Sequence, residues 1–212
     1  MISVNSITKI YGDNEVLSDI SVKFDAGKIY GLVGRNGCGK TMLMKCICGF
    51  VKPTTGKIVI DGKLLGKDMD VPEDIGVIIE NPGFIPNYSG YKNLRLLASV
   101  RGKIGKEEIC AYMEMIGLDA KNRKHVGKYS MGMRQKLGIV QAIMEKPKIL
   151  LLDEPMNGLD HNSVGLVRDI IRKAADDGTL VLLTSHNQED IDTLCDVVYC
   201  MEDGKILDKL VG

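Results

Sequence analysis

The chain has 212 residues, 44% of them hydrophobic and 26% charged, which is typical of one globular domain and excludes a disordered or fibrous protein. Its 28 basic and 28 acidic residues cancel. A protein that binds DNA or RNA through phosphates is normally basic, so no direct nucleic acid partner is expected. Apolar runs such as 149–152 and 180–183 are much shorter than the ~20 residues of a membrane span, and the N-terminus has no signal-peptide pattern. The six cysteines include no CxxC pair, so we expect free thiols in a reducing cytoplasm and no zinc site.

Short apolar runs alternate with helical patterns along the chain, which predicts an α/β fold. Strands are expected at 29–33, 57–60, 75–79, 149–153 and 179–184, followed by a hairpin of 197–201 and 205–210. Helices are expected at 41–49, twice within 92–117 with Gly102 and Gly117 at their C-termini, and after Ser130. Leu94, Leu97 and Ala98 should share one face of the first insert helix. We therefore expect a single domain over 1–212 whose core sheet is interrupted by a helical subdomain at about 85–145.

The clearest motif lies between the strand at 29–33 and the helix that follows it. Residues 34–41 fit G-x-x-x-x-G-K-[ST], the pattern of a phosphate-binding loop. Glycines let backbone N–H groups approach a phosphate, and the helix N-terminus attracts its charge. Lys40 would reach the β- and γ-phosphates, and the Thr41 hydroxyl would bind Mg²⁺. A glycine-rich turn with an exposed lysine is the alternative. The predicted nucleotide-binding residues here are Gly34, Arg35, Asn36, Gly37, Cys38, Gly39, Lys40 and Thr41.

Two further strands end in polar residues that suit hydrolysis. The apolar run 149–152 leads into Asp153, which can hold Mg²⁺ through water, and Glu154, which can orient and deprotonate the attacking water. His186 follows the strand at 179–184 and could donate a hydrogen bond to the γ-phosphate. Carboxyl ends of strands are where α/β folds bind ligands, which favours these roles over solvent-facing carboxylates and a structural histidine.

The third insert helix opens with Ser130 and Gly132, whose hydroxyl and free N–H groups could bind a second anion. A plain helix N-cap is the alternative. Charge is unevenly placed around it: residues 120–144 contain six basic residues and no carboxylate, whereas 174–204 contain eight acidic residues and no lysine or arginine. Both stretches could be solvated faces, or the basic insert could meet phosphate groups.

Taken in order, these motifs resemble those of the ATP-binding subunit of ABC transporters across essentially all 212 residues. The loop at 34–41 resembles Walker A and 149–154 Walker B. The segment at Ser130 is similar to the signature motif, 157–160 to the D-loop, and His186 to the switch histidine. Tyr11 stands where the family stacks an aromatic ring on adenine, although it could be an ordinary strand-end tyrosine. The resemblance implies a P-loop NTPase fold with a mostly parallel core sheet, an N-terminal antiparallel β subdomain and a helical insert.

The same resemblance implies an ATPase that uses ATP and Mg²⁺ and is coupled to transport. It also implies a head-to-tail pair of ATPase subunits, in which Ser130 and Gly132 of one close over the ATP of the other. A separate transmembrane permease would hold the pair at the cytoplasmic face of the cell membrane, and the aromatic-rich segment 84–91 suggests a docking surface for it. A soluble ABC-type ATPase acting on ribosomes or DNA is the rival, but this chain lacks tandem cassettes and long coiled-coil insertions.

Two departures from the family pattern stand out. The signature usually reads Ser-Gly-Gly-Gln, whereas here Met131 and Met133 flank Gly132. The glutamine expected after the strand at 75–79 is Glu80, which could still ligate Mg²⁺ but adds a negative charge; a solvent-facing strand end is the alternative. Both departures resemble the bacitracin- and lantibiotic-type export and immunity ATPases, which implies export of peptide antibiotics or other toxic amphiphiles.

Overall fold

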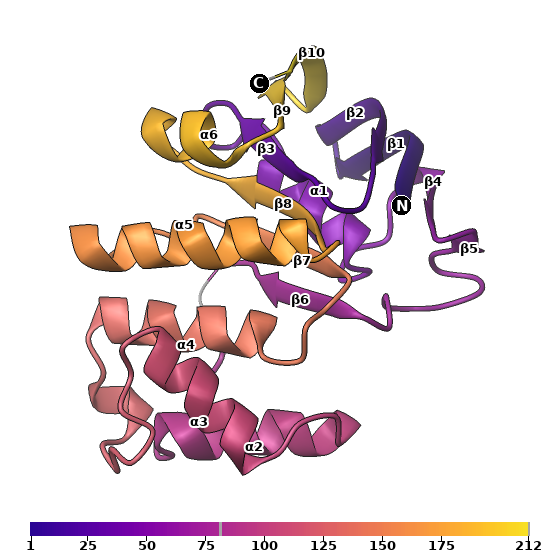
Figure 1. Ribbon diagram of the computed structural model, residues 1–212. Coiled ribbons are helices and arrows are strands. Elements are labelled where there is room, and N and C mark those ends of the chain that lie inside the picture. Colours follow the sequence, from indigo (N-terminus) through magenta and orange to yellow (C-terminus); the bar gives the residue numbers. More distant parts are fainter. Residues whose placement is uncertain (81, 212) are drawn as a thin grey trace.

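Two β-sheets of different type form the framework of the protein (Figure 1). The computed structural model describes residues 1–80 and 82–211. Its larger sheet has six strands in the order β10-β9-β3-β8-β7-β6. All neighbouring strands pair in parallel except the closing hairpin β9–β10. The strands are β3 (Ile29–Val33), β6 (Ile75–Ile78), β7 (Ile149–Asp153), β8 (Leu180–Thr184), β9 (Val197–Glu202) and β10 (Lys205–Val211).

The smaller sheet is antiparallel and has four strands in the order β2-β1-β4-β5. Residues alternate between its two faces, so that Ile2 and Val4 of β1 are buried while their neighbours are less so. The strand register shifts between Val4 and Ile7, which returns Ile7 to the buried face. Its buried face packs with helix α1 (Lys40–Ile47) against the larger sheet and forms one hydrophobic core. The strands are β1 (Ile2–Tyr11), β2 (Asn14–Phe24), β4 (Thr55–Ile60) and β5 (Lys63–Leu64).

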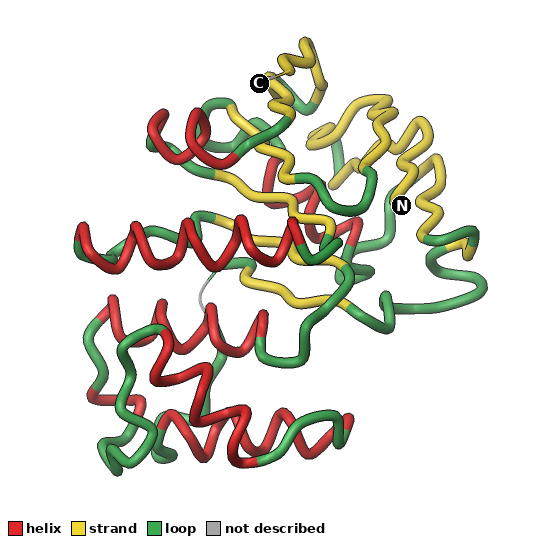
Figure 2. The backbone as a smooth tube through the Cα atoms, in the orientation of Figure 1, coloured by secondary structure: helices red, strands yellow, loops and turns green. Residues whose placement is uncertain are grey.

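Helices gather on the other side of the larger sheet, as the secondary-structure colouring makes plain (Figure 2). Helices α5 (His161–Asp176) and α6 (Gln188–Leu194) contact the sheet layer, and α2 (Gly90–Arg101), α3 (Lys106–Met115) and α4 (Met131–Ile143) form a separate lobe (Figure 1). A 3-10 turn, Val126–Lys128, precedes α4. A second hydrophobic core joins this lobe to the sheet. None of the helices in the described part of the chain is long and apolar enough to cross a membrane.

Because layers cover both of its faces, the larger sheet contains continuous apolar strands instead of alternating ones. All five residues of β8 are buried, as are the first four of β7. The predicted α/β class, the mostly parallel core sheet and the antiparallel N-terminal sheet are confirmed.

The apolar face of α2 is only partly buried. Leu94 and Ala98 are buried, but Leu97 is 40% exposed. Residues 94 and 98 are one helical turn apart and face the lobe interior together, which leaves Leu97 at the edge of the apolar stripe. The predicted helix C-termini are confirmed: Gly102 and Gly117 both adopt the left-handed conformation, with φ of 65° and 77°.

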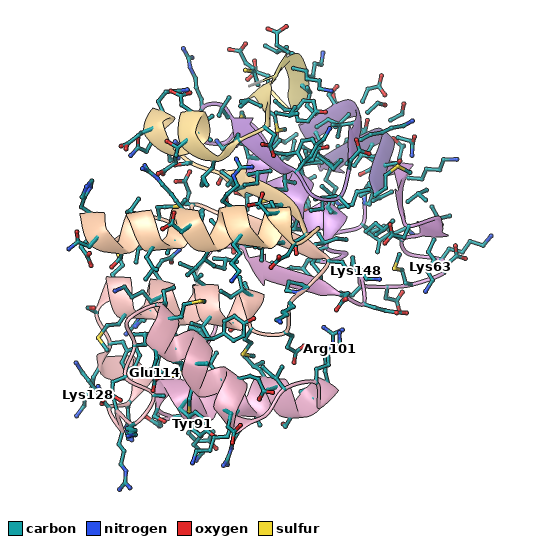
Figure 3. The ribbon with its side chains drawn as sticks, viewed as in Figure 1. Lys63, Tyr91, Arg101, Glu114, Lys128 and Lys148 are labelled. Carbon is teal, nitrogen blue, oxygen red and sulfur yellow. The ribbon has the colours of Figure 1, made fainter. Side chains whose placement is uncertain are left out.

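The structure shows where the acidic stretch 174–204 and the basic stretch 120–144 lie and which of their charges are paired. Several acidic residues of 174–204 are neutralised by α5, because Arg168 pairs with Glu189 and Asp190, and Arg172 pairs with Asp196. That stretch is therefore only partly a solvated face. The basic residues of 120–144 lie on the helical lobe, where Lys128 extends from the surface (Figure 3).

Candidate functional site

A cleft of about 340 Å³ lies at the carboxyl ends of β3, β7 and β8. The parallel arrangement brings these three strand ends to one edge of the sheet, which is where α/β folds bind ligands. Most of the cleft lining consists of residues predicted from the sequence: Asn36, Gly37, Gly39, Lys40, Thr41, Glu80, Asp153, Glu154 and His186. Val16, Met42 and Lys45 complete it.

The loop between β3 and α1 is held in shape by close packing of its glycines. Gly34 has φ of 153°, and a Cβ there would lie 2.2 Å from the carbonyl oxygen of Met201. Gly39 has φ of 106°, and a Cβ there would lie 2.8 Å from the side chain of Leu17. The turn of the β9–β10 hairpin supports the loop from behind, since the Gly204 N–H donates to the carbonyl of Cys38. No other residue type fits Gly34 or Gly39 without moving these supports.

Lys40 reaches back across this loop. Its ammonium donates to the carbonyl of Gly34 at 2.7 Å and to that of Arg35 at 3.1 Å, and the residue is only 7% exposed. The Cys38 thiol lies 3.9 Å from the same ammonium and is buried. The structure therefore gathers one cation, backbone N–H groups and a helix N-terminus in one place, which is the arrangement that binds phosphate.

Asp153 links the ends of β7 and β8 to the start of α1. Thr41 donates to Asp153 Oδ2 at 2.7 Å, and Thr184 donates to Asp153 Oδ1 at 2.7 Å. Thr184 in turn accepts the N–H of Glu154 at 2.9 Å. The sequence analysis missed Thr184; a hydroxyl at the end of a strand beside the aspartate strand was the available signal. The hydroxyl and carboxylate oxygens of this cluster are the hard donors that Mg²⁺ prefers.

Glu154 and His186 face one another across the cleft. The backbone N–H of His186 donates to Glu154 Oε2 at 3.3 Å. The imidazole Nε2 of the same residue lies 3.2 Å from Glu154 Oε1. That second contact lacks hydrogen-bond geometry, so Oε1 is a buried oxygen without a hydrogen-bond donor among the described residues. A buried acceptor of this kind fits a site that binds a water molecule. Glu154 also has φ of 52°, an uncommon backbone conformation that clusters at functional sites.

Glu80 lines the cleft but is already partnered. Its carboxylate forms an ion pair with the ammonium of Lys45, which lies on α1 one turn after Thr41. The Lys45 side chain is 24% exposed and that of Glu80 is 64% exposed. Glu80 therefore lies at the mouth of the cleft, and the sequence analysis missed the lysine that balances its charge.

Tyr11 lies at the rim, at the end of β1. It is 49% exposed, and its hydroxyl is 4.0 Å from the sulfur of Met42, which lines the cleft. The ammonium of Lys9 lies 4.6 Å above the ring. An exposed aromatic ring near the glycine-rich loop has the apolar face that can stack on a base.

Ser130 and Gly132 do not line this cleft. Ser130 is the N-cap of α4 and accepts the N–H of Met133 at 3.2 Å, as a plain N-cap does. Gly132 packs so closely on the loop after β7 that a Cβ would lie 2.8 Å from the Gly158 carbonyl. The same helix reaches that loop through Gln135, which donates to the Pro155 carbonyl at 2.8 Å and which the sequence analysis also missed.

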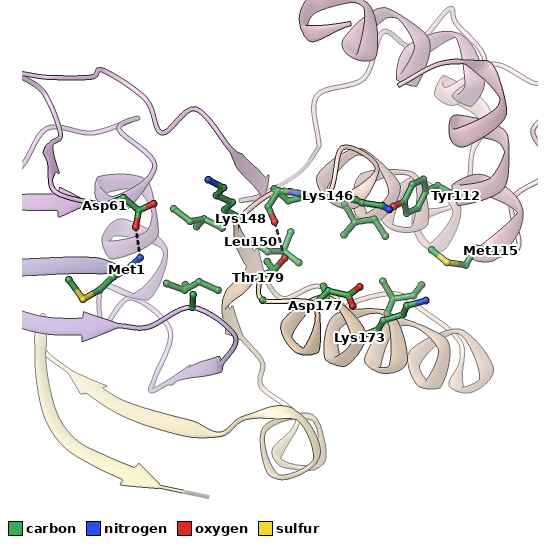
Figure 4. A pocket seen from close by; sticks show the side chains of 18 of the residues that line it. Met1, Asp61, Tyr112, Met115, Lys146, Lys148, Leu150, Lys173, Asp177 and Thr179 are labelled. Carbon is green, nitrogen blue, oxygen red and sulfur yellow. Dashed lines mark hydrogen bonds and ion pairs between the residues drawn. The ribbon is translucent and has the colours of Figure 1, made fainter. Parts of the chain in front are cut away.

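A larger hollow of about 990 Å³ lies at the opposite, amino-terminal ends of β7 and β8 (Figure 4). It opens between α3 and the end of α5, with Tyr112 on one side and Lys173 and Asp177 on the other (Figure 4). Its lining contains neither the glycine-rich loop nor the carboxylates of the strand ends. The smaller cleft is therefore the candidate site, despite its size.

Fold and cleft together define the class of P-loop nucleoside triphosphatases. A strand, a glycine-rich loop and a helix bring Lys40 and Thr41 beside the carboxylate of Asp153 at the end of β7, which is the arrangement of that class.

Comparisons with known proteins place the chain more narrowly. The ABC transporter family model matches residues 17–157, and a shorter match to an AAA domain model covers 124–192. The uncharacterized ABC transporter ATP-binding protein YybJ of Bacillus subtilis is 42% identical over 97% of this chain and 94% of its own length. Bacitracin transport ATP-binding protein BcrA of Enterococcus faecalis is 38% identical over 99% of this chain and 69% of its own length. Lantibiotic transport ATP-binding protein SrtF of Streptococcus pyogenes is 32% identical over 98% of this chain and 89% of its own length.

Solved structures agree on the fold. The ATP-binding subunit of an ABC transporter superposes with a TM-score of 0.91 and 25% identity, over all of this chain and 90% of that one. The dimeric cassette MJ0796 superposes with a TM-score of 0.89 and 20% identity, over all of this chain and 98% of that one. The chain belongs to the ABC transporter family, and it is an ABC ATPase domain.

Proposed function

We propose that this protein hydrolyses ATP in the cleft and thereby drives a membrane exporter of peptide antibiotics or similar toxic amphiphiles. The observation that carries the hydrolytic part is the cluster of Lys40, Thr41, Asp153, Glu154 and His186 at one edge of the parallel sheet. Lys40 holds the β- and γ-phosphates, and the backbone of 34–41 surrounds them. Glu154 accepts the proton of the attacking water, and His186 donates to the γ-phosphate.

Thr41 and Asp153 are the proposed Mg²⁺ ligands, the aspartate through water. Their oxygens already lie within 2.7 Å of one another, and both atoms are of the type that binds this ion. When bound, Mg²⁺ neutralises charge on the β- and γ-phosphates. Glu80 remains a proposed additional ligand, and Lys45 would have to release it first.

We further propose a head-to-tail pair of ATPase subunits. Ser130 and Gly132 do not line the cleft of their own subunit, while Ser130 is exposed at the start of α4. A signature segment oriented in this way is free to meet the ATP of a second copy, as the resemblance to dimeric ABC cassettes suggests. The basic residues of 120–144 would then lie near the triphosphate of the partner subunit.

A separate permease is the proposed membrane partner, which would hold the protein at the cytoplasmic face of the membrane. The aromatic residues of 84–91 are only half-buried contributors to such a surface: Phe84 and Tyr91 pack against the lobe core. More apolar area is exposed on α2, where Leu96 is 48% and Val100 81% exposed. We therefore propose that α2, together with Ile85, provides the docking surface.

The proposed substrate class depends on the relatives named for bacitracin and lantibiotic transport. The test is to isolate the protein from native membranes and to measure antibiotic sensitivity of cells that carry either the wild type or Lys40→Ala. A co-purifying multi-span membrane protein, with sensitivity to a peptide antibiotic rising in the variant, supports the proposal. Co-purifying ribosomal components, or unchanged sensitivity to a panel of peptide antibiotics, would contradict it.

A further inference from the structure

The turn that carries His186 is tied to helix α5 by a buried ion pair. The guanidinium of Arg168 donates to Asp190 Oδ1 through Nε at 2.9 Å and through Nη2 at 2.6 Å. Asp190 is 1% exposed, and its arginine partner also donates to Glu189 at 2.9 Å. A buried carboxylate without its cation would be strongly unfavourable, so the pair is fixed in position.

The second oxygen of Asp190 continues this contact toward the active site. Asp190 Oδ2 accepts the hydroxyl of Ser185 at 2.7 Å, and that hydroxyl accepts the N–H of Asn187 at 3.1 Å. Ser185 and Asn187 are the two neighbours of His186. The His186 N–H itself donates to Glu154 Oε2. An unbroken series of hydrogen bonds therefore connects Arg168 to both sides of the histidine.

Helix α5 also begins at the loop that contacts the signature segment. Its N-cap is Asp160, which accepts the N–H of Ser163 at 2.9 Å and its hydroxyl at 2.8 Å. Gly158, two residues earlier, packs against Met131 and Gly132. The helix that carries Arg168 is thus joined at one end to the signature segment.

We infer that Arg168 is a positioning residue for ATP hydrolysis. Its bond to Asp190 holds the turn 185–187 in the conformation that places the imidazole of His186 beside Glu154. Arg168 forms no hydrogen bond with the cleft-lining residues, so it acts through this turn. The inference is based on the proposed roles of His186 and Glu154.

Arg172 offers a matched control one helical turn further along α5. It donates to Asp196 Oδ1 at 3.0 Å and to the Leu194 carbonyl, at the far end of α6, and makes no bond to 185–187. Hydrogen exchange of the His186 and Asn187 amides measures the turn directly. Arg168→Met should speed both exchanges by about tenfold or more, because each amide donates within this network, whereas Arg172→Met should leave them unchanged.

Turnover provides the second readout. Arg168→Met should lower kcat for ATP at least about fivefold while KM stays within about twofold, since ATP is bound elsewhere. When Arg168→Met is combined with His186→Ala, kcat should not fall below that of His186→Ala alone. Arg168→Lys keeps a cation beside Asp190 but cannot donate through two nitrogens as the guanidinium does, so it should show the same effect if Arg168→Met does not fold.

Two results would overturn the inference. The first is an unchanged rate of exchange at both amides in Arg168→Met, or in Arg168→Lys if Arg168→Met does not fold. The second is a loss of turnover that adds fully to that of His186→Ala. The His186→Ala variant alone distinguishes failure of the proposed function from failure of this inference. Normal turnover in His186→Ala rejects the proposed role of His186, and the inference about Arg168 with it. If His186→Ala is slow and the losses of turnover in the two single variants add fully in the double variant, only the inference about Arg168 is rejected.

Discussion

Glu154→Gln is the sharpest test of the proposed chemistry, because it removes basicity while keeping size. The amide oxygen can still accept the long 3.3 Å bond from the His186 N–H. Even complete loss of that bond would cost only about 0.5–1.5 kcal/mol of folding free energy. Loss of a positioned general base slows a reaction by about 10²–10⁴-fold, or about 2.7–5.4 kcal/mol at 1.36 kcal/mol per tenfold. The effect on turnover should therefore greatly exceed the effect on stability.

The assay compares phosphate release at saturating MgATP with ATP affinity measured by calorimetry. Turnover should fall about 10²–10⁴-fold, while affinity stays near that of the wild type because Lys40, Thr41 and Asp153 are intact. Glu73→Gln is a suitable control, since Glu73 is exposed, pairs with Lys63 and lies outside the cleft lining. Its turnover should be unchanged.

The same variant tests the proposed pair of subunits. ATP that is not hydrolysed should bridge the phosphate-binding loop of one copy and Ser130 of the other, so Glu154→Gln should dimerise with ATP but not with ADP. Adding Ser130→Arg should abolish the dimer, because it places bulk and charge at the exposed start of α4. Light scattering at matched concentrations measures both. A variant that hydrolyses ATP at the normal rate, or stays monomeric with saturating ATP, would refute the reasoning.

Three further outcomes are expected. Lys40→Ala should reduce hydrolysis by more than ~10²-fold in a phosphate-release assay, because it removes the buried ammonium of the loop; near-normal turnover would contradict the assignment. Lys45→Met should change the Mg²⁺ dependence of ATP binding, because it frees the Glu80 carboxylate at the mouth of the cleft, and adding Glu80→Gln should reverse that change, which calorimetry can check against either single variant. Burial raises the pKa of the Cys46 thiol to about 11 and that of Cys195 to about 12, so at pH 8 about 0.1% or less of each is thiolate, and mass spectrometry after iodoacetamide treatment of the folded protein should find neither alkylated.

The sequence could predict the side chains of the cleft because their signals are local. A glycine-rich loop needs its spacing, and an apolar strand ending in Asp153-Glu154 marks the carboxyl edge of a buried sheet. His186 was identified by the same rule, from the strand before it. The helix ends at Gly102 and Gly117 were equally local, since they depend on a left-handed conformation that glycine adopts freely.

Exposure is harder to predict from the sequence, because it depends on what packs nearby. Leu97 shares an apolar helical face with Leu94 and Ala98, yet it lies at the edge of the buried stripe of α2. Phe84 and Tyr91 of the expected docking segment are partly buried against the lobe core, and the docking role of 84–91 stays a prediction. A helical or aromatic pattern shows which residues could be buried but not which neighbour covers them.

What the sequence determined by itself is the fold class and the chemistry available in the cleft, because both depend on residue types at fixed short spacings. Only the tertiary structure decided how those residues are held. The bond of Thr41 to Asp153 spans 112 positions and that of Thr184 to Asp153 spans 31, while Lys45 meets Glu80 across 35. The buried pair of Arg168 and Asp190 likewise joins two helices. No local pattern encodes such pairings, since each exists only when parallel strands and their covering helices bring distant segments to the same edge of the sheet.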